Sequence, residues 1–286
     1  MWKANSHEID HRDLDQPVQF GPYKLHELVN SGGMADLWLA TDEQGQTVGI
    51  KKQHGRFRLD LVAWRRFVRG CEVLAHIHNH DYVIGYLGHG KIDGCRYLAM
   101  EYVEGVNLKQ LIGQADHALA EHIGNILIDS AVALEHVHES GYMHLDFKPE
   151  NVLATRNYSV RLVDFDLAQP RPEKPKKASR YPGTPAYMAP ELLLRQPFDH
   201  RADIFSFGAM AFELLTFRKP FPGENAQEVL RLQLDRNHEF LPPRALNPDI
   251  PYALEKLILK CLETLPDERY PYMSVVVRDL QSALYV

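Results

Sequence analysis

The segment from His144 to Asn151 and the short run from Asp164 to Asp166 constrain this chain more than any other part of its sequence. The first segment reads H-x-D-x-K-x-x-N, and twelve residues separate it from the D-F-D of the second. The pattern brings two aspartates, a lysine and an asparagine into one short span. This spacing is typical of a site that transfers a phosphoryl group. The chain must therefore fold so that these side chains meet.

The length and composition are those of a globular protein. The chain has 286 residues, of which 45% are apolar and 24% charged, enough for one large domain or two modest lobes. A formal net charge of −6 gives no indication of nucleic-acid binding. No apolar run approaches the roughly 20 residues of a membrane helix, and the first residues lack the apolar core of a signal peptide. Three isolated cysteines fit a reducing compartment, so we expect a cytoplasmic protein with no nucleic-acid partner and no membrane segment.

Strand-like segments come first along the chain and helical segments later. Residues 1–21 are polar and predict a flexible N-terminal tail. Alternating runs between turns predict strands at 23–25, 36–40, 47–51, 82–90 and 95–102. Helical periodicity predicts helices at 60–78, 123–138, 202–215 and 252–262. The order predicts an α+β fold with two lobes, a small β-rich lobe with one main helix and a larger, mainly α-helical lobe.

The motifs resemble those of the protein kinase superfamily, and most closely the bacterial serine/threonine kinases of the eukaryotic type. The resemblance covers about residues 23–284. It implies one kinase domain at 22–286, with an N-lobe at 22–103 and a C-lobe at 104–286. It also implies ATP and Mg²⁺ (or Mn²⁺) as cofactors and a protein as the substrate.

The resemblance assigns roles to the central motif. Asp146 corresponds to the catalytic base that accepts the proton of the substrate hydroxyl, and Lys148 corresponds to the residue that neutralises charge on the transferring phosphoryl group. Asn151 and Asp164 correspond to the metal ligands, and their hard oxygen atoms suit Mg²⁺. Lys51, in a V-G-I-K run, corresponds to the lysine that contacts the α- and β-phosphates. Side chains alternate along a strand, so Lys51 shares a face with Gly49.

The same resemblance predicts the nucleotide pocket. A glycine-containing turn lets backbone N–H groups approach phosphate oxygens. Backbone groups of two residues at the junction of the lobes are expected to bind adenine, and apolar side chains to cover its two faces. The predicted nucleotide-binding residues are Val29, Gly32, Gly33, Leu37, Lys51, Glu101, Val103 and Leu153.

Later segments indicate which kind of molecule accepts the phosphoryl group. The run from Gly183 to Glu191 resembles the peptide-docking part of a protein kinase, which favours a protein over a small molecule. Asp203 corresponds to a buried aspartate that fixes the catalytic loop, and Arg269 to the arginine that pairs with Glu191. Lys148 together with Thr184 is the serine/threonine version of the pattern.

Departures from the family pattern surround the predicted site. The run around the main helix aligns Gly70, not Glu72, with the acidic residue that pairs with the strand lysine. Glu72 lies about 200° around the helix from Leu74, so we expect it to point away from Lys51. A one-residue slip or a helix distortion is the alternative that would bring Glu72 to Lys51. If Gly70 leaves Lys51 without a partner, Gly70→Glu is expected to raise activity or ATP affinity.

Two further departures concern regulation and charge. Leu145 replaces the arginine that receives an activating phosphate in many kinases, so we expect a non-RD enzyme of low activity that needs no such phosphate. Asp166 replaces a glycine and adds negative charge, either to tighten cation binding or to face water.

We therefore predict an ATP-dependent serine/threonine protein kinase. The alternative is a pseudokinase, a nucleotide-binding or scaffolding module without transfer activity. A kinase-fold enzyme acting on a small molecule is a third possibility. The sequence does not predict the oligomeric state.

Overall fold

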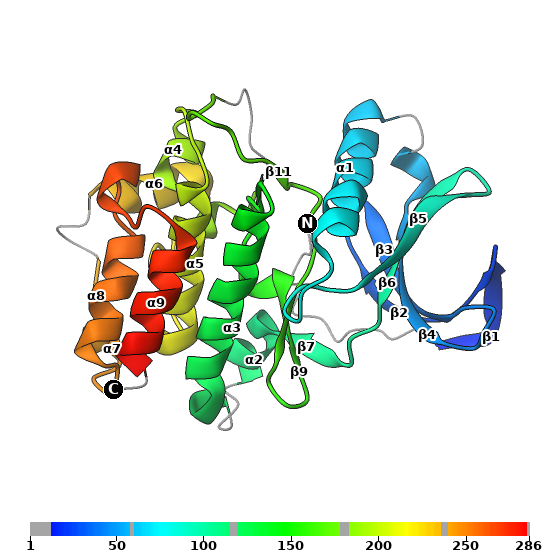
Figure 1. The fold of residues 1–286 in the computed structure, drawn as a ribbon, viewed down its shortest axis with the longest axis horizontal. Coiled ribbons are helices and arrows are strands. Elements are labelled where there is room, and N and C mark those ends of the chain that lie inside the picture. The colour runs from blue at the N-terminus through cyan, green and yellow to red at the C-terminus, as the bar shows by residue number, and fades with distance from the viewer. Residues whose placement is uncertain (1–12, 58–59, 115–118, 178–182, 236–239, 285–286) are drawn as a thin grey trace.

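The computed structural model describes residues 13–57, 60–114, 119–177, 183–235 and 240–284, and the side chains of residues 13–15 are excluded. Figure 1 shows two lobes, with the blue and cyan strands of one on the right and the helices of the other on the left. In chain order, the elements of the first lobe are β1 (Asp13–Phe20), β2 (Tyr23–Ser31), β3 (Ala35–Thr41), β4 (Thr47–Gln53), the 3-10 helix η1 (Gly55–Phe57), α1 (Leu61–Ile77), β5 (Tyr86–Ile92) and β6 (Cys95–Glu101).

The second lobe is mainly helical. Its elements up to the middle of the lobe are β7 (Gly105–Asn107), α2 (Leu108–Gln114), α3 (Leu119–Glu139), β8 (Tyr142–Met143), η2 (Pro149–Asn151), β9 (Val152–Thr155), β10 (Val160–Leu162) and β11 (Gln169–Pro170). They are followed by η3 (Pro185–Tyr187), α4 (Pro190–Leu193), α5 (Arg201–Thr216), α6 (Ala226–Leu234), α7 (Pro243–Leu246), α8 (Tyr252–Cys261), η4 (Pro266–Glu268) and α9 (Met273–Leu284).

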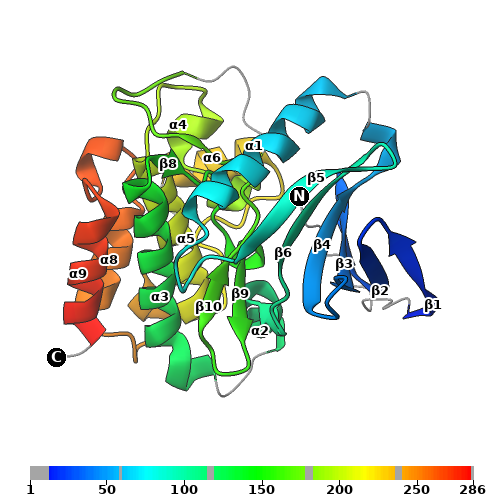
Figure 2. The same ribbon diagram turned by 45° about the vertical axis from the view of Figure 1, so that its right-hand side comes forward.

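The first lobe is an antiparallel sheet in the order β1-β2-β3-β4-β6-β5, with α1 beside it (Figure 2). Alternation along β4 puts Val48 and Ile50 into a small apolar cluster on one face of the sheet. Gly49 and Lys51 face the space between the lobes, which confirms their predicted shared face. Lys52 points the other way, and its Nζ lies 4.6 Å from the centre of the Phe20 ring.

One part of the predicted organisation is wrong. The flexible tail was expected to reach residue 21, but Asp13–Phe20 form β1, which pairs with β2 through a bulge. Phe20 anchors the end of this strand because it is buried in the cluster formed with Leu25 and Ile50. Residues 1–12 lie outside the described part of the chain.

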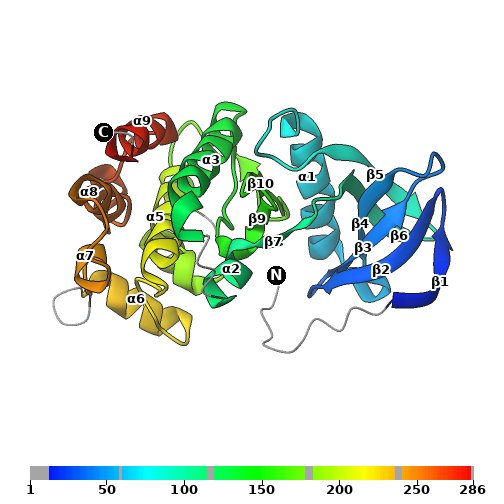
Figure 3. The same cartoon turned by 90° about the horizontal axis from the view of Figure 1, so that it is seen from below.

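The helical lobe is built around α5, which is buried along almost its whole length. α3 packs against α5 and α9, and the small sheet β10-β9-β7 lies on the side that faces the first lobe (Figure 3). No helix in the described part of the chain is both long and apolar enough to span a bilayer.

Two of the connections between the lobes are made by the backbone alone. The first is the short segment between the end of β6 at Glu101 and the start of β7 at Gly105. The second is a pair of backbone hydrogen bonds, from Ile84 N to Leu162 O and from Leu162 N to Tyr82 O, at 3.1 and 2.8 Å. The segment between α1 and β5 is therefore attached directly to the small sheet of the helical lobe.

Candidate active site

The loop that carries the H-x-D-x-K-x-x-N motif is fixed by a buried carboxylate at the start of α5. Asp203 accepts hydrogen bonds from the backbone N–H groups of His144 and Leu145 at 2.8 and 2.7 Å. His138 Nε2 donates to the same carboxylate at 2.9 Å. Although burial raises it, the pKa of Asp203 lies below its ordinary value because His138 and the backbone donors stabilise the anion. The predicted anchoring role of Asp203 is confirmed.

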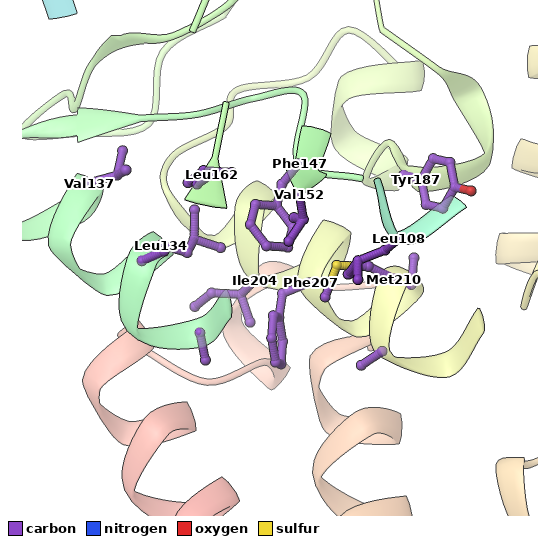
Figure 4. Packing of buried hydrophobic residues seen from close by; sticks show 14 of the residues in the cluster. Leu108, Leu134, Val137, Phe147, Val152, Leu162, Tyr187, Ile204, Phe207 and Met210 are labelled. Carbon is purple, nitrogen blue, oxygen red and sulfur yellow. The ribbon is translucent and has the colours of Figure 1, made fainter. Parts of the chain in front are cut away.

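Apolar packing fixes the same loop from below. Phe147, between Asp146 and Lys148, points into the core, where its ring centre lies 6.2 Å from that of Phe207 on α5. Figure 4 shows Phe147 beside Val152, facing the row of α5 side chains. Asp146 and Lys148, on either side of Phe147, instead contact each other, and Lys148 also contacts Thr184.

We expect Asp203→Asn to lower the free energy of unfolding by about 1–3 kcal/mol at pH 7, because an amide group then faces buried donors. The folded pKa of Asp203 is below the ordinary value of 3.8, so its stabilising contribution is complete above that value and is lost as the pH falls through the folded pKa. The difference between wild type and variant should therefore shrink from pH 7 to pH 3. Urea unfolding at each pH measures it, and a constant difference would contradict the assignment.

The polar side chains of the motif form one connected network. Lys148 Nζ donates to Asp146 Oδ2 at 2.8 Å and to Thr184 Oγ1 at 3.1 Å. Asn151 Nδ2 donates to the backbone oxygen and to Oδ2 of Asp146, at 2.8 and 3.1 Å. These donors fix the orientation of the Asp146 carboxylate. Thr184, from the predicted docking segment, contacts the motif at Lys148.

The orientation of Asn151 fits a metal ligand. Its Nδ2 is engaged by Asp146, so its Oδ1 is the atom left to bind something else. That oxygen is buried and has no hydrogen-bond partner among the described residues. An unpartnered buried oxygen is costly unless a ligand satisfies it. Asn151 and Asp164 are therefore suited to hold Mg²⁺, which prefers hard oxygen ligands.

Lys51 lies between two carboxylates. Its Nζ is 3.0 Å from Asp164 Oδ1 and 2.8 Å from Asp166 Oδ2, and all three side chains are mostly buried. Burial lowers the pKa of Lys51, but the two aspartates outweigh it and hold the pKa above its ordinary value. Asp164 adopts φ of 64°, a left-handed conformation that aims its carboxylate at Lys51. Sequence reasoning did not identify Asp166 as a partner of Lys51.

A cavity of about 250 Å³ lies between the lobes and reaches this cluster. Most of the predicted nucleotide-binding residues line it: Val29, Leu37, Lys51, Glu101, Val103 and Leu153. The predicted turn residues Gly32 and Gly33 line a smaller adjoining hollow with Lys51 and Asp164. The structure thus brings the predicted nucleotide-binding residues together beside Asp164.

The geometry of α1 decides between the two expectations for its acidic residue. Glu72 is exposed, whereas Gly70 is buried and faces the cavity. The alternative of a slip or helix distortion is therefore wrong. The expected effect of Gly70→Glu also needs correction, because an added Cβ would lie 3.0 Å from the backbone N and Cα of Asp166. A side chain at position 70 therefore fits only if the loop at Asp166 shifts by a few tenths of an ångström.

The predicted docking segment is joined to the helical lobe by a buried ion pair. Arg269 donates from both terminal nitrogens to the two Glu191 oxygens, at 2.7 and 2.8 Å. Tyr187 donates to Glu213 Oε2 on α5 at 2.5 Å, and Lys109 pairs with the other Glu213 oxygen. The first pair was predicted from the sequence. The Glu213 pairs were not, because no local pattern links these distant positions.

The model of the protein kinase domain family matches residues 23–280. The chain belongs to the protein kinase family. It is 30% identical over 280 residues to a probable serine/threonine-protein kinase of Streptomyces coelicolor, covering 95% of this chain and 41% of the relative. It is 31% identical to a probable serine/threonine-protein kinase of Clostridium perfringens and 30% identical to the serine/threonine-protein kinase PknH of Mycobacterium tuberculosis, covering 91% of this chain and 38% and 42% of the relatives.

The chain therefore spans about two fifths of the length of these curated relatives. The match covers both lobes, which agrees with the observed bilobal α+β fold of the kinase domain.

Proposed function

We propose that the chain transfers the γ-phosphoryl group of ATP to serine or threonine hydroxyls of a protein. The observation that carries the proposal is the connected network around Asp146, in which Lys148 and Asn151 donate to the same carboxylate. The named activity of the similar bacterial proteins supports the same conclusion. ATP is expected to occupy the cavity between the lobes, where apolar side chains would cover both faces of its adenine ring.

Each side chain of the network has a proposed task. Asp146 orients the acceptor hydroxyl and receives its proton, and its fixed orientation lowers the entropy cost of that alignment. Lys148, between Asp146 and Thr184, places a positive charge where negative charge develops on the transferred group. Lys51 contacts the α- and β-phosphates. Asn151 and Asp164 would hold Mg²⁺, which would neutralise charge on the phosphates when bound.

The docking segment supports a protein as acceptor. The Glu191–Arg269 pair and the Tyr187–Glu213 contact fix this segment beside the catalytic loop through buried groups. Thr184, in the same segment, contacts Lys148 directly. A peptide bound along the segment would therefore present its hydroxyl close to Asp146. We propose the cytoplasm, where ATP is present, as the compartment.

Leu145 supports activity without an activating phosphate. Its side chain is 3% exposed and packed in the core, so this position offers no cation to receive a phosphoryl group. We propose that transfer persists after phosphatase treatment of the purified protein, and a loss of activity on such treatment would exclude the idea. The acidic partner of Lys51 comes from the loop after Asp164 instead of from α1, unlike the usual family arrangement. We therefore expect turnover below the usual range of about 1–100 per second.

The pseudokinase alternative depended on a missing acidic partner for Lys51. Asp166 provides an acidic group at 2.8 Å from Lys51 Nζ, which weakens that argument. The docking segment is held in place by buried contacts, which favours a protein over a small molecule as the acceptor.

Incubation with labelled ATP, Mg²⁺ and a generic basic protein tests the proposal. We expect label on serine or threonine of the acceptor, and no label when a chelator removes divalent cations. Binding of ATP without any transfer would favour the pseudokinase. Label found only on a small molecule would favour the third possibility.

A further inference from the structure

The helix that packs against the active site contributes no carboxylate to it. Glu72 is the sole acidic residue within Leu61–Ile77, and it is exposed. In protein kinases an acidic residue on this helix normally forms the ion pair that positions the strand lysine. Something else must position Lys51 in this chain.

Asp166 occupies the place of that carboxylate. Its Oδ2 lies 2.8 Å from Lys51 Nζ, and the two side chains are 14% and 9% exposed. Asp166 comes from the loop after Asp164, so it reaches Lys51 from the side of the helical lobe instead of from α1. The Phe67 ring of α1 flanks the lysine at 5.9 Å but brings no charge.

Gly70 makes this arrangement possible. The glycine is buried on the face of α1 that meets the cavity, directly against Asp166. A Cβ built on Gly70 would lie 3.0 Å from the Asp166 backbone N, from its Cα and from its Oδ1. Glycine within a helix costs about 1 kcal/mol relative to alanine. The close approach of Asp166 gives that cost a structural purpose.

We propose that Asp166 is the positioning residue for Lys51, and that Gly70 provides the space for it. The proposal rests on the proposed kinase function and specifies how its lysine is held. The residue that positions Lys51 and the proposed metal ligand Asp164 then lie in the same three-residue segment, from Asp164 to Asp166. Lys51 is positioned whenever that loop is in place, independently of any displacement of α1.

Moving the acidic group from position 166 to position 70 tests the proposal, with the KM for ATP as the measured quantity. Asp166→Asn and Asp166→Gly are expected to raise the KM for ATP by about tenfold to a hundredfold, because a charged hydrogen bond to Lys51 is lost. Gly70→Glu alone should also lower activity, since its side chain collides with Asp166. The double variant Gly70→Glu/Asp166→Gly removes the Asp166 side chain and lets the loop backbone, 3.0 Å from the added Cβ, shift more freely, so it should recover KM to within a few-fold of wild type. Glu72→Gln is the control on the same helix and should change nothing.

A second measurement does not depend on catalysis. The free energy of unfolding is measured without nucleotide for wild type, Lys51→Met, Asp166→Asn and Lys51→Met/Asp166→Asn. These four values give the coupling between the Lys51 and Asp166 side chains. We expect the unfolding equilibrium constant of the double variant to differ by about tenfold from the value that the two single variants predict together. Additive values together with an unchanged KM in Asp166→Asn would overturn the proposal. Coupling without any phosphoryl transfer in wild type would instead overturn the proposed function and leave the anchoring intact.

Discussion

Asp146→Asn is expected to lower the rate of phosphoryl transfer by about 10²–10⁴-fold while ATP affinity stays within a few-fold of wild type. The substitution keeps the size of the side chain, and its remaining oxygen can still accept from Lys148 and Asn151. It removes the negative charge that receives the proton of the acceptor hydroxyl. The adenine side of the cavity is unaffected, so binding and transfer should separate. Steady-state transfer and calorimetric titration with ATP measure the two quantities.

The control for this variant is Asp249→Asn, because Asp249 is exposed and does not line the cavity. Its transfer rate should equal that of wild type. Equal transfer by Asp146→Asn and wild type would remove Asp146 from the reaction and with it the proposed role of the loop.

Arg269→Met is expected to lower the free energy of unfolding by roughly 3–5 kcal/mol, because the Glu191 carboxylate is then buried without its partner. Arg269 also donates to the backbone oxygens of Glu263, Arg201 and Thr264, so its loss affects several segments. The midpoint of thermal unfolding should fall by on the order of 10 °C. Calorimetry or urea titration measures the change.

A matched control uses an exposed ion pair of the same type. Arg156 pairs with Glu104, and their side chains are 80% and 67% exposed. Arg156→Met should therefore alter stability by less than about 0.5 kcal/mol. The double variant Glu191→Met/Arg269→Met should recover part of the loss, since no buried charge remains unpaired. Equal effects of Arg156→Met and Arg269→Met would show that the buried pair has no special weight.

Much of the catalytic loop could be predicted because its residues are close in sequence. The distances from Asp146 to Lys148 and Asn151 are set by a few backbone angles, so the pattern alone indicates the network. The direction of Lys51 followed from the alternation of side chains along β4. The exposure of Glu72 followed from helix geometry in the same way.

Contacts between distant segments that the family resemblance did not supply were beyond such reasoning. Asp166 could be assigned to Lys51 only by knowing that its loop approaches α1 at Gly70. The sequence marks Gly70 and Asp166 only as two separate departures from the family pattern, and the structure shows that they meet. His138 likewise meets Asp203 through the packing of α3 on α5. Strand β1 was missed because its polar sequence resembles that of a tail, whereas pairing with β2 orders it.

The two attachments between the lobes have a mechanical consequence. The hydrogen bonds of Leu162 with Tyr82 and Ile84 lie beside the connecting segment at residues 102–104, because Glu101 N donates to Gly85 O at 2.8 Å. Both attachments therefore lie at the Ile84 and Glu101 end of the cavity, and we expect rocking of the first lobe to displace the turn at Gly32 and Gly33 more than Ile84. Amide exchange should therefore be slower at Ile84 than at Gly32 and Gly33. We expect nucleotide to enter and leave the cavity past this glycine turn.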